Sequence, residues 1–168
     1  MKRWTRIMSL ALVVLAVSTC EPEREAARTS PAYELSLVDS GLRPLNEREI
    51  VALLSNATVY ATFVLTEQGW IEYFDSSGAV VRTTVPQEPP GRGTGRRLLY
   101  GSWWGEGGNI CFVYGLSRFA ECYRLYFRDG TLLYIQTKSS RLVPAGALLA
   151  YSTEIRKGDV ERFPLIGD

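Results

Sequence analysis

Apolar and polar residues alternate along several short segments of this chain. Between Thr58 and Leu65, positions 59, 61, 63 and 65 are apolar, and Thr58, Tyr60 and Thr62 lie between them. An alternation with period two is typical of a strand that buries one face. Comparable segments, separated by turns rich in Gly, Asp, Asn and Ser, predict seven or eight strands: Thr58–Leu65, Trp70–Phe74, Ala79–Val85, Arg96–Trp104, a fifth that follows the turn Glu106–Asn109, Glu121–Phe127, Thr131–Lys138 and, as an eighth, Ala147–Glu154.

The spacing and number of these segments predict a mainly β fold. Short strands joined by tight turns favour an antiparallel up-and-down meander. Several strands are partly apolar on both faces, and closure into a small lipocalin-like barrel would give one face an interior and remove the exposed edges. A barrel of about eight strands is nearly filled by side chains or holds one small ligand.

One segment, Pro44–Asn56, carries the signals of a helix. Asn46 and Glu49 have the spacing of a capping box, in which each side chain bonds the backbone of the other. Leu53 and Leu54 continue the apolar stripe that begins at Ile50. We therefore predict a single N-terminal helix that packs against one end of the barrel.

Two cysteines lie at equal distances from a predicted turn at Gly115–Arg118. Strands that leave this turn in register would place Cys111 directly opposite Cys122. A disulfide needs Cβ atoms about 3.5–4.5 Å apart, which the non-hydrogen-bonded type of cross-strand pair allows. We predict a disulfide between them, and two unpaired buried thiols are the alternative.

The first 19 residues have the pattern of a signal peptide. Lys2, Arg3 and Arg6 precede an apolar segment that is too short for a membrane span. The residues before Cys20 look like a lipobox, which predicts a lipid-acylated Cys20 and a lipid bilayer as partner. Ordinary cleavage after Ser18, giving a soluble secreted protein, is the alternative.

The remaining chain divides into a spacer and a domain. Residues 20–43 are polar, charged and contain two prolines, so we expect a disordered tether. Residues 44–168 would form the barrel domain with its leading helix. This organisation predicts a periplasmic protein attached to a bacterial membrane.

Composition narrows the range of chemistry. The chain has no histidine, which removes the Ser-His-Asp and Cys-His arrangements and most zinc sites. Without the three basic residues of the leader, 16 basic residues face 18 acidic ones, and this balance gives no reason to expect nucleic-acid binding. The acidic residues Glu72, Asp75, Glu106, Glu121 and Asp129 sit mainly at predicted turns, and turn formation explains Asp75 and Asp129. We therefore expect no enzyme activity, no catalytic residues, no metal and no cofactor.

Several short motifs occur in the order seen in a known family. They are the helix Leu45–Ile50 with Leu53 and Leu54, the hairpin Tyr73–Gly78, Gly101–Trp103, Cys111, Cys122 and Arg128–Gly130. In this order the chain resembles a family of small secreted proteobacterial proteins of unknown function, which are lipocalin-like half-barrels. The resemblance spans Pro44–Gln136. It implies an envelope-associated β domain and carries no catalytic residues.

Two functions remain open at this point. In the first, the barrel binds a small apolar ligand through aromatic residues at its strands, for which Trp103, Trp104, Tyr114 and Tyr123 are the candidates. Because adjacent strand residues face opposite ways, one of the two tryptophans should be core. In the second, the protein is an interaction or inhibitor module that docks on an envelope protein through its outer face or through Pro86–Gly95. Arg92, Arg96 and Arg97 form a local basic patch that would suit an anionic partner, and a solvated loop is the alternative.

Overall fold

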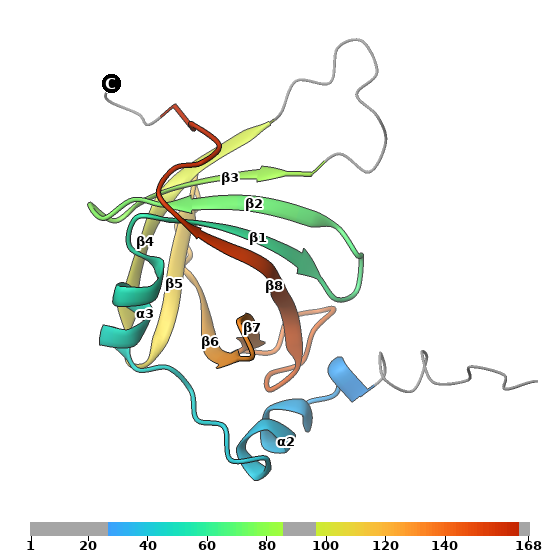
Figure 1. Ribbon diagram of the computed structural model, residues 1–168. Coiled ribbons are helices and arrows are strands. Elements are labelled where there is room, and N and C mark those ends of the chain that lie inside the picture. The colour runs from blue at the N-terminus through green and yellow to red at the C-terminus, as the bar shows by residue number, and fades with distance from the viewer. Residues whose placement is uncertain (1–26, 86–96, 165–168) are drawn as a thin grey trace, which may run out of the picture.

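The computed structural model describes residues 27–85 and 97–164 of the chain. In this part, eight antiparallel strands follow one another around a closed barrel (Figure 1). Closure is made by β1, which pairs with β2 on one side and with β8 on the other. The strands are β1 (Ala57–Phe63), β2 (Gly69–Phe74), β3 (Ala79–Thr84), β4 (Leu98–Glu106), β5 (Asn109–Tyr114), β6 (Glu121–Arg128), β7 (Thr131–Gln136) and β8 (Leu148–Lys157).

The predicted fold class and the eight strands are confirmed. The bounds differ by up to three residues: β1 and β7 end two residues earlier than predicted, β4 ends two residues later, and β8 continues to Lys157. A bulge in the β1–β8 pairing at Tyr60 and another irregularity in the β7–β8 pairing at Tyr134 shift the register along β8. Such bulges bend a strand, and this bending helps to close a small barrel.

Inward-facing residues of the strands form the main core. The alternation along β2 sends Trp70, Glu72 and Phe74 into the barrel, whereas Ile71 and Tyr73 face outward. The fully or nearly fully buried members of this core include Val59, Ala61, Trp70, Phe74, Val80, Trp103, Ile110, Phe112, Leu125, Leu132, Tyr134 and Ala150.

The helix α3 (Glu47–Leu54) packs against β1, β4 and β5. The predicted capping box is present, with Asn46 and Glu49 each bonding the other's backbone N–H. Ile50 and Leu54 are fully buried and complete the interior core. At the other end of the helix, Lys157 Nζ of β8 donates to carbonyls of the last turn and so satisfies acceptors that a helix leaves unpaired.

A second helix, α2 (Tyr33–Asp39), replaces part of the predicted tether. The expectation of disorder up to residue 43 is therefore wrong for this segment, and residues 27–85 contain a helix besides the predicted one. Leu37 of α2 is buried against an outward-facing cluster that includes Leu133 and Ile135 of β7. This helix is short and depends on contacts with the outer face of the barrel, where Leu37 is buried, so the local sequence did not predict it.

The outer face of β2 and β3 is covered by the chain that follows β8. Phe163 is buried with Ile71, Tyr73 and Val81. Several strands are apolar on both faces because their inward residues form the interior cluster and their outward residues form two more, one beneath α2 and one beneath Phe163. Burial of both faces removes a large apolar area from water.

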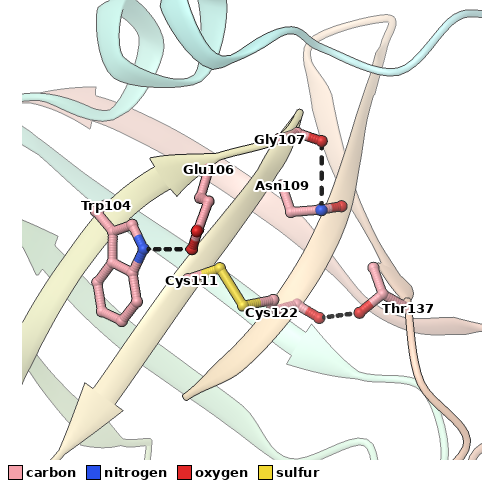
Figure 2. The surroundings of a disulfide bond; sticks show 7 residues. All are labelled: Trp104, Glu106, Gly107, Asn109, Cys111, Cys122 and Thr137. Carbon is pink, nitrogen blue, oxygen red and sulfur yellow. Dashed lines mark hydrogen bonds between the residues drawn. A yellow bond between two sulfur atoms is a disulfide. The ribbon is translucent and has the colours of Figure 1, made fainter.

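Cys111 and Cys122 form the predicted disulfide, at directly opposed positions of β5 and β6. Their Cα atoms are 4.1 Å apart, as suits a non-hydrogen-bonded pair. The disulfide lies in a row across the strands, with Trp104 on one side and Thr137 on the other (Figure 2). This row is on the outer face, because Ile110 and Phe112 on either side of Cys111 point into the core.

Candidate functional site

A pocket of about 320 Å³ remains inside the barrel. Its lining comes from residues near the end of the barrel opposite α3, where β1, β3 and β5 end and β2, β6 and β8 begin. The strand alternation that builds the core also points these side chains inward. They are Phe63, Trp70, Arg82, Phe112, Glu121, Tyr123, Tyr134, Leu149 and Ala150.

An ion pair lies beside this pocket, within the barrel. Glu72 of β2 and Arg82 of β3 are cross-strand partners, and Arg82 Nε donates to Glu72 Oε1 at 3.0 Å. The carboxylate is fully buried and also accepts from Trp70 Nε1 and from the Tyr114 hydroxyl. Three donors that face one carboxyl group leave both of its oxygens as acceptors, which is the arrangement of a carboxylate ion.

Burial and pairing act on Glu72 in opposite directions. Burial raises the pKa of Glu72 above its ordinary value, while the charge of Arg82 and the hydrogen bonds from Trp70 and Arg82 oppose this rise. A buried carboxylate is tolerated when it is paired and hydrogen-bonded, as it is in this protein. The pair therefore places two compensating charges in an otherwise aromatic interior.

The guanidinium of Arg82 is held between two aromatic rings. Its central carbon lies 5.1 Å from the ring centre of Trp70 and 4.7 Å from that of Tyr114. These are cation–π distances, and the two contacts help to hold the guanidinium in place. Within the described chain, no residue accepts a hydrogen bond from either terminal nitrogen of Arg82. Two of its nitrogens thus remain available to a molecule in the pocket that Arg82 lines.

Tyr134 of β7 contributes a second unused donor. Its side chain is 1% exposed, and no residue in the described part of the chain bonds its hydroxyl. Burial raises the pKa of Tyr134 well above its ordinary value, and the neighbouring charge of Glu72 acts in the same direction. The hydroxyl is therefore neutral over the physiological range and can donate a hydrogen bond.

The mouth of the pocket is more polar than its interior. Tyr123 donates its hydroxyl to Glu121 Oε2 at 2.8 Å, and burial raises the pKa of Tyr123. A second hollow of about 350 Å³ shares Glu121, Tyr123 and Leu149 with the pocket and continues outward past Gln136 to Ser140. Glu121 itself is exposed, so these three residues mark the passage between the interior and the surface.

The structure separates the four residues predicted to bind a ligand. Tyr123 lines the pocket, and Tyr114 lies beside it through its contacts with Glu72 and Arg82. Trp103 is the tryptophan that belongs to the core, where its Nε1 donates to the carbonyl of Asp75 and its ring packs edge-on against Phe74.

The expectation that Trp104 contacts an interior ligand is wrong, because its side chain lies on the outer face of the barrel. There its Nε1 donates to Glu106 beside the disulfide (Figure 2). Trp103 is also absent from the pocket lining, since it packs with Phe74 near the turn between β2 and β3. The four candidates therefore do not form one site.

Other predicted features fall on residues outside the described part of the chain. The signal peptide and Cys20 are among them, and so are the segment Pro86–Gly95 with Arg92, and Arg96. Of the predicted basic patch, only Arg97 is described, and it is exposed.

The sequence contained a signal for the residues that were missed. The hairpin turn at Asp75–Gly78 pairs Phe74 with Val80, and the same symmetry pairs Glu72 with Arg82. Positions 70, 72 and 74 face the same side of the strand, so Glu72 could have been expected to point inward with Trp70 and Phe74. Its cross-strand partner Arg82 would then also point inward. The assignment of acidic residues mainly to turns overlooked this one, which lies in the middle of β2. Tyr134 gave no comparable signal, because all of the four residues Leu132–Ile135 are buried.

Among residues 27–85 and 97–164, no group of three or more His, Cys, Asp or Glu side chains is arranged to hold a metal ion. No helix in these ranges has both the length and the apolar character that a bilayer-spanning helix needs. No protein-family model, curated protein or solved structure matches this chain. The resemblance to small secreted proteobacterial proteins therefore stays a prediction.

Proposed function

We propose that this protein is a non-enzymatic binding protein that holds one small, largely apolar ligand inside its barrel. The observation that carries the proposal is the interior pocket of about 320 Å³, which is lined mainly by aromatic and aliphatic side chains with a few polar groups. Ligand sites in proteins typically occupy about 300–1,000 Å³ and have this mixture of walls. The size of the pocket favours a ligand at the small end of this range.

The chemistry of the pocket supports binding rather than catalysis. Glu72 already accepts hydrogen bonds from three neighbours, so it is poorly placed to accept a proton from a substrate. The guanidinium of Arg82 carries only hydrogen-bond donors and so cannot act as a base. The polar groups are suited to orienting a bound molecule.

We further propose that the protein works in the bacterial envelope, attached through an acylated Cys20. The pairing of Cys111 with Cys122 supports this location, because structural disulfides persist mainly in oxidising compartments. The pairing also leaves Cys20 as the odd cysteine, next to a lipobox-like sequence. Mass spectrometry of the mature N-terminus tests this point: a diacylglyceryl-modified Cys20 is expected, and an unmodified N-terminus at residue 19 or 20 would contradict it.

Binding inside the barrel can be tested with N-phenyl-1-naphthylamine, a neutral apolar probe whose fluorescence rises in dry surroundings. We expect saturable binding of one probe per protein. Leu149→Trp, which enlarges a side chain at the pocket mouth, should weaken this binding by about tenfold or more.

The matched control is Leu142→Trp, at a leucine that is 78% exposed and not part of the pocket lining. This variant should bind the probe like the unmodified protein. Absence of saturable binding, or equal affinity in all three proteins, would contradict a ligand site in the interior.

A further inference from the structure

The hydrogen bonds already made inside the barrel show what a ligand would have to supply. The oxygens of Glu72 are engaged by Trp70, Arg82 and Tyr114. The groups left over are donors: the terminal nitrogens of Arg82, which belong to a partly exposed side chain of the pocket lining, and the hydroxyl of Tyr134, which is buried without a partner in the described chain. A buried donor without a partner is unfavourable, so a molecule that brings an acceptor is preferred over one that does not.

The charges on the walls act against an ionic ligand. The positive charge of Arg82 is compensated by Glu72 at 3.0 Å, so an added anion would leave the buried group with a net negative charge. Glu121 at the mouth would add to this repulsion. A cation would meet the guanidinium of Arg82 inside the pocket. A neutral acceptor avoids both costs.

The remaining walls suit a flat apolar body. Phe63 lies against Trp70, with ring centres 4.2 Å apart, and Trp70 meets Tyr134 edge-on at 6.1 Å. Phe112 and Tyr123 complete an aromatic lining at a ring distance of 6.1 Å from each other. Planar molecules pack well on such rings in offset or edge-on arrangements.

We propose that the pocket selects a neutral, planar apolar ligand with one hydrogen-bond acceptor, such as a ketone, ester or amide carbonyl, which binds the Tyr134 hydroxyl and the terminal nitrogens of Arg82. This inference rests on the proposed ligand-binding function and adds the chemical class of the ligand. It assigns the head-group site to two residues on opposite sides of the barrel interior, β3 and β7.

Three compounds of nearly equal shape test the proposal by isothermal titration calorimetry. They are 2-acetonaphthone, which carries a neutral carbonyl, 2-isopropenylnaphthalene, which has a CH₂ in place of that oxygen, and 2-naphthoate, which is an anion. We expect 2-acetonaphthone to bind about ten- to a hundredfold more tightly than 2-isopropenylnaphthalene, because a hydrogen bond from a charged donor is among the stronger ones. It should also bind more tightly than 2-naphthoate.

The variant Tyr134→Phe removes one of the two proposed donors without opening the fold. Because the hydroxyl has no partner within the described chain, its loss should leave the thermal midpoint unchanged or higher. The preference for 2-acetonaphthone over 2-isopropenylnaphthalene should fall by about three- to tenfold. Tyr126→Phe is the matched control, because Tyr126 bonds Glu34 on the outer face and should not alter the preference.

The outcomes separate this inference from the proposed function. Equal binding of the two neutral compounds, tightest binding of 2-naphthoate, or an unchanged preference in Tyr134→Phe would overturn the inference and leave an apolar binding pocket intact. Failure of all three compounds to bind would overturn the inference together with the proposed function.

Discussion

Glu72 and Arg82 are the residues on which the interior depends most. Glu72 is fully buried, and the Arg82 side chain is 16% exposed, so water screens the pair only weakly. Pairs of this kind contribute little net stability compared with apolar residues of similar volume, but the loss of one partner leaves an uncompensated buried charge. Their presence is therefore better explained by positioning of the pocket donors than by stability.

This explanation predicts an asymmetry between single and double substitutions. Arg82→Met should lower the free energy of unfolding by about 3 kcal/mol, since Glu72 then stays buried without a counter-ion. The double variant Glu72→Leu, Arg82→Met should recover most of this loss. Urea denaturation at pH 7 measures both, and a double variant less stable than Arg82→Met would contradict the explanation.

The pH dependence of stability follows from the direction of the Glu72 pKa. Burial raises this pKa above the ordinary value of 4.5, so the folded protein holds the proton more tightly than the unfolded chain. The contribution of Glu72 to stability is then greatest below about pH 4.5 and decreases as the pH rises through the folded pKa.

In Arg82→Met the decrease should be larger, because Arg82 is a main factor that opposes the rise of the Glu72 pKa. Urea denaturation between pH 4 and 8 provides the comparison, with Glu72→Gln as the reference that removes the titration. If the stability of Arg82→Met and of Glu72→Gln depends on pH in the same way, ionisation of the buried Glu72 does not destabilise the protein, and this explanation is wrong.

Among the elements, α2 shows how a tertiary contact overrides a weak local signal. Its seven residues are too few for an independent helix in water. Leu37 supplies the buried contact, and Glu34 of the same helix accepts hydrogen bonds from Arg124 and Tyr126 of β6. Burial, together with the hydrogen bond to Glu34, raises the pKa of Tyr126 to about 12. The helix is thus part of the barrel surface and not of a tether.

Two leucines of α2 allow this to be tested within one helix. Leu37→Ala should lower the free energy of unfolding by about 2 kcal/mol, at the low end for a buried leucine, because α2 lies at the periphery. Leu35 is 65% exposed, and Leu35→Ala should change stability by less than about 0.5 kcal/mol. Equal small effects in thermal or urea unfolding would show that the segment is a flexible tether after all.

Strands, turns and the helix α3 could be predicted from sequence because their signals are local. The positive φ angles of Asp129 and Gly130 match the tight turn expected between β6 and β7, and that of Asn56 matches the expected end of α3. The disulfide followed from the same logic, since a short turn fixes the register on both of its sides. What local pattern could not supply was contact between distant segments, such as Leu37 on β7 or Phe163 on β2 and β3.

For the molecule as a whole, the interior is divided between a packed end and an open end. Ile50 and Leu54 of α3 complete the packed end, and the pocket occupies the region around Trp70 and Tyr134 at the other. Eight strands leave space for side chains or for one small ligand, and in this barrel both descriptions apply, each to one end. The sequence predicted such a barrel but placed its ligand residues by aromatic type alone. Alternate residues of each strand point into and out of the barrel, and the hairpin turns fix which positions point inward. This rule selects other residues for the ligand site than aromatic type does.

The proposed small neutral ligand would bind within the barrel beside Tyr134. Isotope-filtered NMR of the labelled protein with 2-acetonaphthone tests it most directly, because intermolecular contacts identify the side chains that touch the ligand. We expect contacts from the naphthalene protons to the rings of Trp70, Phe112 and Tyr134 in a saturable one-to-one complex. Contacts confined to residues of the outer face, such as Leu133 and Tyr151 beneath α2, would contradict it.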